Sequence, residues 1–575
     1  MTAQPSVDWV HVYAQNVMIP ETRWEVIVGL DTDADHNIYL AGSLLGTADL
    51  DPDADGGDSD TLRTAPEAQG PTTFVVSYDQ AGGLRWKFSL PVTRRSTPTG
   101  LAVDERYVYV VGKFSGRIDL DPGPLDADET ASGFVAAYER ASGAFVWGGS
   151  VRGDRGVELN SVATDGELVY VTGAFSGLTD FAFGRRSAPG VPFRMGERDI
   201  FIAAYSTRDG ALEWLNTYPS PGLDLGHSLA VLDGQLFAVG QFQEILRLDE
   251  EEELVPSPIL PSSSIAFLAA FEAESGEFNW SQMLQGASIS DLAALNDKVV
   301  LSGSYGWLAQ FETDPLTRFV RVTEQAQSAD AFIASYEADD GTPNWVETLN
   351  SLYLNFGHAV TLTNTSVYAT GWVGGDATTS PGSAALPLAA SNPDQRIHWD
   401  AFIIARDLDS GILTDAFTIG TPLNDGGYAI AAFTEAATDR IVVVTEFEPG
   451  SASGLGFESY ESDVPARALT SYSFAVPTNT EGHAVPSSDL SPDLTRVASG
   501  AGVLRVSLKA PQEGVYHTTV YDMMGRRVLT GPVLYAMKNH VVYGEVSLAS
   551  LAPGRYALVA QHENEVETLL FNLTR

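Results

Sequence analysis

The stretch YERASGAFVW, residues 138–147, decides the fold because it recurs along the chain. Related stretches end at Trp214, Trp280 and Trp345, and a looser copy, YDQAGGLRW, ends at Trp86. The steps from Trp to Trp are 61, 67, 66 and 65 residues. In each copy an alternating strand pattern leads into a polar turn with Gly and then into a strand that carries the Trp, which indicates a β-hairpin. A hairpin repeated at this period is typical of four-stranded propeller blades.

A second signal precedes each hairpin. It is an apolar strand that ends in Gly, as in YVYVVG and LVYVTG, and upstream of it lies a short strand of small residues. The strands end at Gly42, Gly112, Gly173, Gly240, Gly303 and Gly371. Each repeat therefore predicts an inner strand, a second strand, a long loop, a third strand, a tight turn and a Trp strand.

The last repeat is incomplete. It contains AIAAFTE, RIVVVTEF and LTSYSFAVP but has no Trp strand, and the repeat before it has Asp415 where its neighbours have Trp. Residues 7–17, around Trp9, form an isolated Trp strand with no inner strand before it. We therefore predict a seven-bladed β-propeller over residues 1–477 that is closed by its N-terminal strand, which would leave no open sheet edge.

The composition changes after Pro477. Residues 478–490 form a polar linker, and residues 491–575 contain eight basic and seven acidic side chains. Alternating segments separated by turn signals predict a small immunoglobulin-like β-sandwich over residues 491–575. The fold class is therefore all-β, and the acidity belongs to the propeller.

Charge and composition exclude several classes of function. The formal net charge of −42 argues against nucleic acid and against an anionic membrane surface as partners. No apolar run is long enough to span a bilayer, so no membrane insertion is expected. With no Cys, the chain has no disulfide and no thiolate metal site. The first residues, MTAQPSVDW, lack the features of a signal peptide.

The tail carries two signatures, VYDMMGRRV around Tyr521 and PGRY around Gly554. With them it resembles the type A C-terminal sorting domain of type IX secretion system substrates. The residues that carry the resemblance are Tyr521, Asp522, Gly525, Arg526, Gly554 and Tyr556. The resemblance implies export across the outer membrane of a Bacteroidota-like bacterium, the type IX secretion machinery as a partner, and a secreted or cell-surface location.

The repeats carry FSGRIDLDPG at residues 114–123 and related sequences at residues 45–53 and 175–180. In these they resemble bacterial surface β-propeller repeats of the DFDPG type, which implies a surface propeller and no particular activity. The Trp hairpin also resembles the docking motif of quinoprotein propellers and of an outer-membrane assembly scaffold. Because the chain has no vicinal Cys pair, a packing role between blades is favoured over a quinone cofactor.

Acidic loops are the candidate metal sites. Alternating carboxylates are the oxygen ligands that Ca²⁺ prefers, so calcium is the one cofactor that the sequence suggests. The alternative is a solvated acidic turn. The candidate ligands are Asp49, Asp51, Asp53, Asp55, Asp119 and Asp121.

A polar ring is the candidate ligand site. The inner strands of a propeller run in the same direction, so residues thirteen positions before each Gly marker should surround one mouth of the tunnel. The ring residues are Thr99, Asn160, His227, Ser290 and His358, with Tyr428 in a similar place in the last repeat. They would hold a small ligand, or they are solvated rim residues. No nucleophile elbow, zinc-spaced His motif or phosphate loop is present, so no catalytic residue is assigned.

These observations favour a secreted or surface-held, non-enzymatic binding or structural protein whose propeller face engages a protein or a glycan. One alternative is an extracellular hydrolase or lyase with its site at the tunnel mouth. Another is a subunit of a surface assembly that retains its C-terminal domain as an interaction module. A fold does not choose among these, because function depends on the site that the fold carries.

Overall fold

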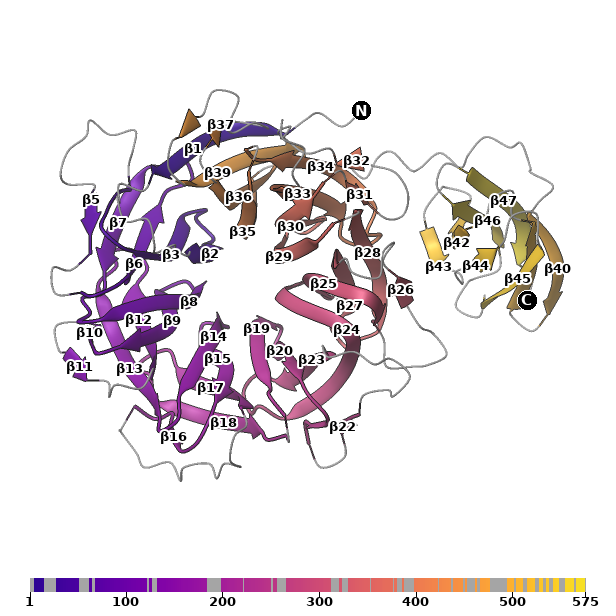
Figure 1. Ribbon diagram of the computed structural model, residues 1–575. Coiled ribbons are helices and arrows are strands. Elements are labelled where there is room, and N and C mark those ends of the chain that lie inside the picture. Colours follow the sequence, from indigo (N-terminus) through magenta and orange to yellow (C-terminus); the bar gives the residue numbers. More distant parts are fainter. Residues whose placement is uncertain are drawn as a thin grey trace. The chain divides into compact units, whose positions relative to one another are not determined.

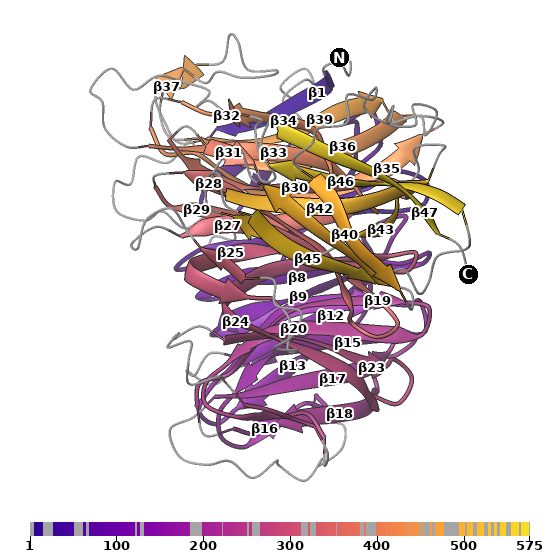
Figure 2. The ribbon, with the colours of Figure 1, turned by 90° about the vertical axis from the view of Figure 1, so that its right-hand side faces the viewer.

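Strands make up the regular structure of this chain, as the computed structural model shows. It describes residues 5–14, 27–50, 61–64, 68–120, 124–126, 132–183, 198–220, 222–249, 252–255, 265–311, 320–322, 329–351, 353–375, 377–379, 385–386, 398–421, 423–435, 438–447, 450–451, 461–462, 466–475, 494–500, 503–509, 514–522, 527–530, 534–536, 541–547, 554–562 and 565–573. No helix occurs in these ranges (Figure 2), which confirms the predicted all-β class. Consequently, none of the described residues forms a helix that could cross a membrane.

Most strands fall into antiparallel groups of four, which we call modules and name after their inner strands. The β2 module contains β2 (Ile27–Thr32), β3 (Ile38–Leu44), β6 (Thr72–Tyr78) and β7 (Leu84–Ser89). The β8 module contains β8 (Arg95–Val103), β9 (Tyr107–Ser115), β12 (Ser132–Glu139) and β13 (Phe145–Gly153). The β14 module contains β14 (Val157–Thr164), β15 (Leu168–Phe175), β17 (Asp199–Ser206) and β18 (Leu212–Tyr218). The β29 module contains β29 (Asn355–Leu362), β30 (Ser366–Gly374), β33 (Trp399–Asp407) and β34 (Leu413–Ile419).

Two further modules share one long strand. The β19 module contains β19 (Leu225–Leu232), β20 (Gln235–Phe242), β23 (Ile265–Glu272) and the first half of β24 (Phe278–Leu295). The second half of β24 is the inner strand of the β25 module, with β25 (Lys298–Gln310), β27 (Asp330–Glu337) and β28 (Pro343–Ser351). The pairing register of β24 shifts at Gly286, whose φ of 85° suits glycine. One strand thus ends a module and begins the next.

The β35 module joins distant parts of the chain. It contains β35 (Gly426–Glu435), β36 (Thr438–Phe447) and β39 (Ala466–Ala475), and its fourth strand is β1 (Ser6–Ala14). Strand β1, the strand expected around Trp9, pairs antiparallel with β39 from Ser6 opposite Ser473 to Ala14 opposite Ala466. The N-terminal strand therefore covers the outer edge of this module.

Short strands extend several connections and edges. They are β4 (Thr47–Asp49), β5 (Thr61–Arg63), β10 (Arg117–Asp119), β11 (Pro124–Asp126), β16 (Thr179–Asp180), β21 (Leu246–Arg247), β22 (Glu253–Leu254), β26 (Val320–Val322), β31 (Ala377–Thr379), β32 (Ala385–Leu386), β37 (Gly450–Ser451) and β38 (Glu461–Ser462). Most of them pair as two-stranded ribbons, such as β10 with β11.

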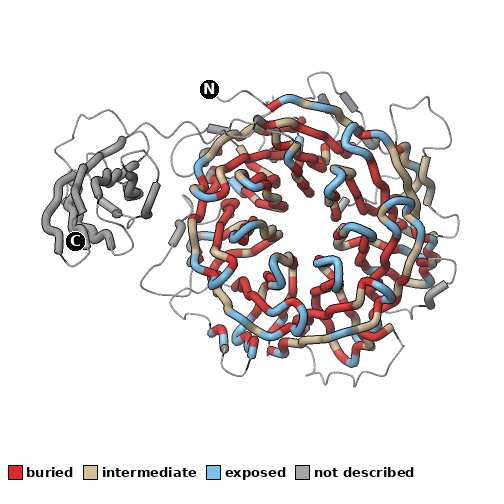
Figure 3. The backbone as a smooth tube through the Cα atoms, turned by 180° about the vertical axis from the view of Figure 1, so that it is seen from behind, coloured by how far each residue is buried: buried red, intermediate tan, exposed pale blue. Residues whose placement is uncertain are grey.

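The modules stand side by side in a ring (Figure 1), with strands such as β2, β8, β14, β19, β29 and β35 nearest its centre. In the part of the chain that is described, no sheet closes on itself, so the ring consists of separate sheets. Figure 3 shows buried positions along the strands of each module and exposed positions at their turns. The fold is therefore of the β-propeller type.

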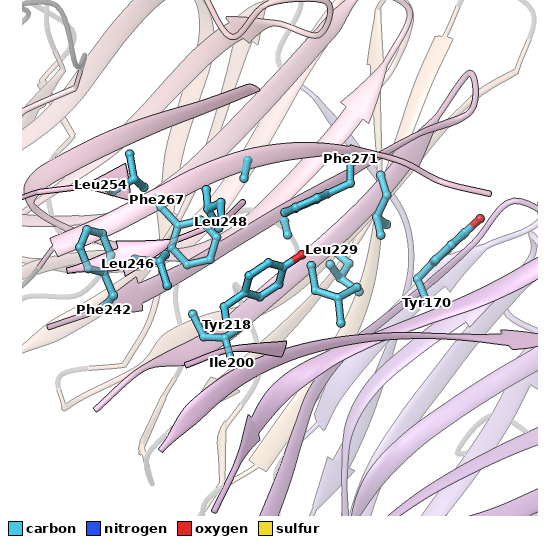
Figure 4. Close-up of a cluster of buried hydrophobic side chains, with 14 of the residues drawn as sticks. Tyr170, Ile200, Tyr218, Leu229, Phe242, Leu246, Leu248, Leu254, Phe267 and Phe271 are labelled. Atoms are coloured by element: carbon cyan, nitrogen blue, oxygen red, sulfur yellow. The ribbon is translucent and has the colours of Figure 1, made fainter. Parts of the chain in front are cut away.

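The core lies between neighbouring modules. One cluster combines Tyr170, Ile200 and Tyr218 of the β14 module with Phe242 and Phe267 of the β19 module (Figure 4). These side chains are at least nine-tenths buried. Because each sheet buries both faces against its neighbours, the strands read as apolar runs, which is what the sequence showed at YVYVVG and LVYVTG.

The repeated Trp docks each module on the next. The indole Nε1–H of the outer-strand Trp donates a hydrogen bond to a carbonyl in the turn between the third and outer strands of the following module. The pairs are Trp9 with Gln80 (3.1 Å), Trp86 with Arg140 (3.0 Å), Trp147 with Thr207 (2.8 Å), Trp214 with Ala273 (3.1 Å), Trp280 with Ala338 (3.1 Å) and Trp345 with Leu408 (3.0 Å). The Trp hairpin is therefore a packing device.

A turn glycine receives each indole ring. At Gly210, φ is 68° and a Cβ atom would lie 2.5 Å from Cε3 of Trp147, so no larger residue fits without a shift. The same close approach occurs between Trp9 of β1 and Gly82 of the β2 module. Strand β1 therefore docks as the other outer strands do. Asp415 replaces Trp in β34, and the module that follows has no such turn because its outer strand comes from the N-terminus.

The chain divides into two compact parts. The first is Met1–Ala377 with Ala385–Val476, and the second is Thr378–Ala384 with Pro477–Arg575. In the second part, β40 (Leu494–Gly500), β41 (Val503–Lys509) and β45 (Val541–Ser547) form one sheet. A second sheet contains β42 (Gly514–Asp522), β43 (Arg527–Thr530), β44 (Leu534–Ala536), β46 (Gly554–His562) and β47 (Glu565–Leu573).

Candidate functional site

A cavity of about 470 Å³ lies among the inner strands of the ring. Each inner strand contributes consecutive residues to its wall. The lining residues are 28–32 of β2, 99–103 of β8, 160–164 of β14, 227–231 of β19, 290–292 of β24, 358–361 of β29 and 428–432 of β35. This volume falls within the range of about 300–1,000 Å³ that small-molecule sites occupy.

The six predicted ring residues all line this cavity, and each is the first lining residue of its strand. Each also stands at a β-bulge, where the pairing register skips one residue. The skipped residues are Thr99, Asn160, His227, Ser290, His358 and Tyr428. Strand β2 has the same bulge at Val28, which the sequence did not predict. A bulge leaves one residue unpaired and redirects its side chain, and bulges are enriched beside active sites.

The bulges gather at one end of the cavity. Hydrogen bonds between neighbouring inner strands join residues whose distances from their bulges agree to within one residue. The side-chain Nδ2–H of Asn160, a bulge residue, donates to the carbonyl oxygen of Gly226 at 2.8 Å, and Leu229 N–H donates to Ser161 Oγ at 3.1 Å. The strands therefore run in the same direction, and we call the end that carries the bulges the bulge end.

The same end of the ring carries exposed apolar side chains. Inner and third strands start at this end, so the connections from outer to inner strands and from second to third strands form one face, the bulge face. Its exposed apolar residues are Val28, Leu178, Leu223, Ile245, Val255, Tyr353, Leu354 and Leu423. Among the described residues, one large apolar side chain of comparable exposure, Ile412, lies in a turn of the opposite face. Among the described residues, the bulge face therefore carries most of the exposed large apolar side chains.

Aromatic rings gather on one side of the bulge end. The imidazole of His358 stacks on Trp372 with ring centroids 4.9 Å apart, and Tyr428 lies 5.5 Å from the same imidazole. Phe356 and Trp399 lie 5.8 and 6.4 Å from Trp372. We call these five residues the aromatic corner. They come from β29, β30, β33 and β35, which lie across the opening from β8 and β14 (Figure 1).

An arginine fixes the outer side of the corner. The guanidinium carbon of Arg467 lies 5.8 Å from the centroid of the Tyr428 ring, and the same guanidinium forms an ion pair with Glu446 at 3.1 Å. A cation over the ring face attracts the π-system of Tyr428. The Arg467 guanidinium therefore packs against one side of Tyr428, and Glu446 neutralises its charge.

Two carboxyl groups brace the cavity wall. Asp291 accepts hydrogen bonds from Ser228 Oγ–H at 3.0 Å and from Val360 N–H at 3.1 Å, so it joins three modules. Asp31 accepts a hydrogen bond from Val103 N–H at 2.9 Å and so joins the β2 and β8 modules. Burial raises the pKa of Asp31 to about 7 and that of Asp291 to about 6, although these hydrogen bonds act in the opposite direction.

The two imidazoles of the ring are neutral at pH 7. Burial lowers the pKa of His358 to about 4 and also lowers the pKa of His227, where a side-chain hydrogen bond to Gln241 acts in the opposite direction. Nε2 of His227 and Oγ1 of Thr99 are buried and have no hydrogen-bond partner among the described residues. Such atoms are uncommon in folded proteins and call for an explanation, such as a bound ligand.

The predicted calcium ligands fall mostly outside the described structure. Asp51, Asp53, Asp55 and Asp121 lie outside the described residues, as does the side chain of Asp49 in β4. Asp119 in β10 is described, and its Oδ1 atom is buried without a hydrogen-bond partner. That orphaned oxygen fits a cation ligand. Within the described ranges, no group of three or more His, Asp or Glu side chains is placed to hold a metal ion.

The two sequence signatures of the tail meet in one sheet. Strands β42 and β46 pair antiparallel with Asp522 opposite Tyr556 and Tyr521 opposite Ala557. Gly554 begins β46, whereas Gly525 and Arg526 lie outside the described residues. The pairing brings together two signatures that are more than thirty residues apart in the sequence.

Comparisons with known proteins add a distant structural likeness. No family model matches the chain, and no curated protein matches it. A subtype N10 neuraminidase-like protein of A/little yellow-shouldered bat/Guatemala/060/2010 is 6% identical over 82% of this chain and 99% of its own, with a TM-score of 0.31. The parainfluenza virus 5 hemagglutinin-neuraminidase ectodomain is 9% identical over 64% of this chain and 79% of its own, with a TM-score of 0.27. A Synechocystis apocarotenoid oxygenase mutant, Glu150Gln in that protein's numbering, is 10% identical over 82% of this chain and 97% of its own, with a TM-score of 0.35. At these values the likeness carries no information about activity.

Proposed function

We propose that this chain is a secreted or cell-surface, non-enzymatic binding protein. Its first part would be a seven-bladed propeller, and its bulge face would engage a protein or a glycan. The observation that carries the proposal is the bulge that recurs in each inner strand and places an unpaired side chain at the same end of the cavity. A repeated bulge costs ladder hydrogen bonds in each module, which supports a use for the redirected side chains.

The chemistry of the cavity supports binding over catalysis. Asp31 and Asp291 are already committed to hydrogen bonds that join modules, and His227 and His358 are neutral at pH 7. A binding protein needs only to position such groups, whereas a catalyst also needs them free to exchange protons with a substrate.

A binding assay with matched variants tests the proposal. The protein would carry a fluorescent label, and its binding to the surface of its source cells would be measured by flow cytometry. We expect the double variant Leu223→Asp with Leu423→Asp to lose binding, because both side chains are exposed on the bulge face. Ile412→Asp, a change of the same kind on the opposite face, should bind as the unmodified protein does. Equal binding by all three proteins would show that the bulge face is not the docking surface.

An extracellular hydrolase or lyase is the second candidate. The raised pKa values of Asp31 and Asp291 favour it, because a general acid must hold a proton near neutral pH. Product release from a panel of polysaccharides and peptides, abolished by Asp291→Asn but retained by Asp339→Asn in an exposed turn, would support this candidate over a binding protein.

The second part of the chain would be an immunoglobulin-like sorting domain for type IX secretion. Its two sheets and the pairing of the two signatures support this assignment. The intact mass of the protein from its native surface or medium tests it. A species that ends near residue 490 would indicate that the domain is removed after export. A species that ends at Arg575 would favour a subunit of a surface assembly that retains the domain for interactions.

Calcium would bind the acidic connections between second and third strands. Asp119, at the end of β10, has a buried oxygen without a hydrogen-bond partner, which is the described observation that supports it. The cation would supply structural stabilisation of an acidic loop through carboxylate ligands.

A further inference from the structure

The bulge end has two chemically different sides. The aromatic corner forms one side, where His358 and Tyr428 line the cavity and Trp372 packs behind them. Strands β8 and β14, across the opening in Figure 1, contribute the short polar residues Thr99 and Asn160 to the lining. An occupant that fits both sides has a flat apolar face and a rim of hydrogen-bonding groups.

From this geometry we propose that the bulge end binds one uncharged sugar ring of a glycan, with the C–H face of the ring on the aromatic corner. The inference rests on the proposed binding function and names its ligand class. A pyranose has the required shape, because its axial C–H groups form an apolar face and its hydroxyl groups form a polar rim. Aromatic rings provide large, rigid apolar contact area for such a face.

The unpartnered polar atoms of the ring suit hydroxyl groups. Oγ1 of Thr99 and Nε2 of His227 are buried without partners in the described structure. A hydroxyl group both donates and accepts, so it satisfies His227 whichever ring nitrogen carries the proton. Both atoms have almost no solvent-accessible area, so a ligand hydroxyl reaches them when neighbouring side chains of the wall shift, and it then satisfies a group that is costly to leave without a partner.

The charges around the cavity disfavour an anionic ligand. The lining residues include no Lys or Arg, so the wall has no partner for a carboxylate, sulfate or phosphate. The titratable side chains of the wall are Asp31, His227, Asp291, His358 and Tyr428, and burial shifts both Asp and both His toward their neutral forms. The net charge of −42 also repels anionic glycans. A cationic sugar would approach Tyr428 beside Arg467, which already occupies one side of that ring.

Ligand-observed NMR with the full chain tests the proposal. The neutral probes are the methyl glycosides of glucose, galactose, mannose and N-acetylglucosamine, and the charged probes are glucuronic acid and glucosamine. We expect saturation transfer from the protein to at least one neutral probe, strongest at the protons of one ring face. The charged probes should give no transfer under the same conditions.

Variants locate the binding site. Tyr428→Ala should weaken the neutral probe at least tenfold by removing the stacking surface. Thr99→Val keeps the shape of the side chain but removes the hydroxyl, and should weaken binding by about two- to tenfold, the equivalent of one hydrogen bond. Ile412→Ala changes an exposed side chain in a turn of the opposite face, and should leave the dissociation constant unchanged.

Two results would overturn the inference. One is a lack of transfer to every neutral probe at millimolar concentration, and the other is an unchanged dissociation constant in both Tyr428→Ala and Thr99→Val. If the bulge-face variants of Leu223 and Leu423 still abolish cell binding in that case, the binding function stands and only the sugar assignment fails. If neither set of variants changes anything, both fail.

Discussion

Replacing Gly210 by alanine should loosen the docking of the β14 module on its neighbour. Gly210 lies in the turn between β17 and β18 with a φ of 68°, and its Cβ position is 2.5 Å from Cε3 and 2.9 Å from Cδ2 of Trp147. Trp147 is 4% exposed and holds Thr207 through the hydrogen bond described above. Alanine therefore adds both backbone strain and a steric clash.

Gly166 provides the matched control. It lies in another turn of the same module with a φ of 87°, and nothing lies within 4 Å of its Cβ position. A left-handed conformation costs an alanine about 1–2 kcal/mol at either position. Overpacking costs about 1–3 kcal/mol more, and only Gly210→Ala incurs it. The difference of about 1–3 kcal/mol corresponds to a factor of roughly 5 to 150 in the equilibrium for local opening, since about 1.4 kcal/mol is tenfold.

Hydrogen exchange followed by mass spectrometry measures this difference. Peptides that cover the turn report the hydrogen bonds between Ser206 and Gly210 at 3.0 Å and between Ser206 and Ala211 at 2.8 Å. Gly210→Ala should speed exchange in its turn more than Gly166→Ala speeds exchange in its own turn, by the factor above. In a Trp147→Leu background the two alanine substitutions should cost the same. A larger effect for Gly166→Ala, or an unchanged effect of Gly210→Ala without Trp147, would refute the docking role.

Three further predictions follow from the ring and its wall. First, Asp31 and Asp291 have folded-state pKa values of about 7 and 6, above the value of about 3.9 in an unfolded chain. The folded state therefore binds more protons between these limits, and the free energy of unfolding falls as pH rises from about 4 to 7. The melting temperature of the unmodified protein minus that of Asp31→Asn should shrink over this window, and a constant difference would contradict the assignment. Second, deleting residues 1–14 uncovers the edge of β39, so light scattering should detect self-association, whereas a strictly monomeric product would argue against β1 as the edge cover. Third, Ca²⁺ should raise the melting temperature and Asp119→Asn should reduce that rise; no response to Ca²⁺ or to chelation would remove the proposed site.

The sequence identified the repeating elements because each carries a local chemical requirement. Trp147 and the turn glycine Gly210 form one contact between neighbouring modules, so both residues recur at the same spacing. The same logic located the ring. Each bulge lies thirteen residues before a Gly within the second strand wherever the intervening turn has the same length, as between Thr99 and Gly112.

Elsewhere the sequence lacked a repeated signal. In the β2 module the bulge is at Val28, fourteen residues before Gly42, because the turn at residues 33–37 is one residue longer and includes His36 at a φ of 63°. The aromatic corner was not predicted because Trp372 occurs in one module, and the other modules have no Trp at the equivalent position. The hydrogen bond from Val103 to Asp31 also left no pattern, since among 75 acidic residues a single pair is not distinctive.

The placement of β1 sets an order for folding. Its partner β39 lies more than 450 residues later in the chain, and Asp8 meets Ser471 and Ser473 only when both ends of the array are present. Contacts so distant in sequence form late, because the intervening chain must first be brought together. A growing chain would therefore carry β1 without its strand partner until the last module is made. The pairing of β1 with β39 therefore forms only once every module between these two strands is present.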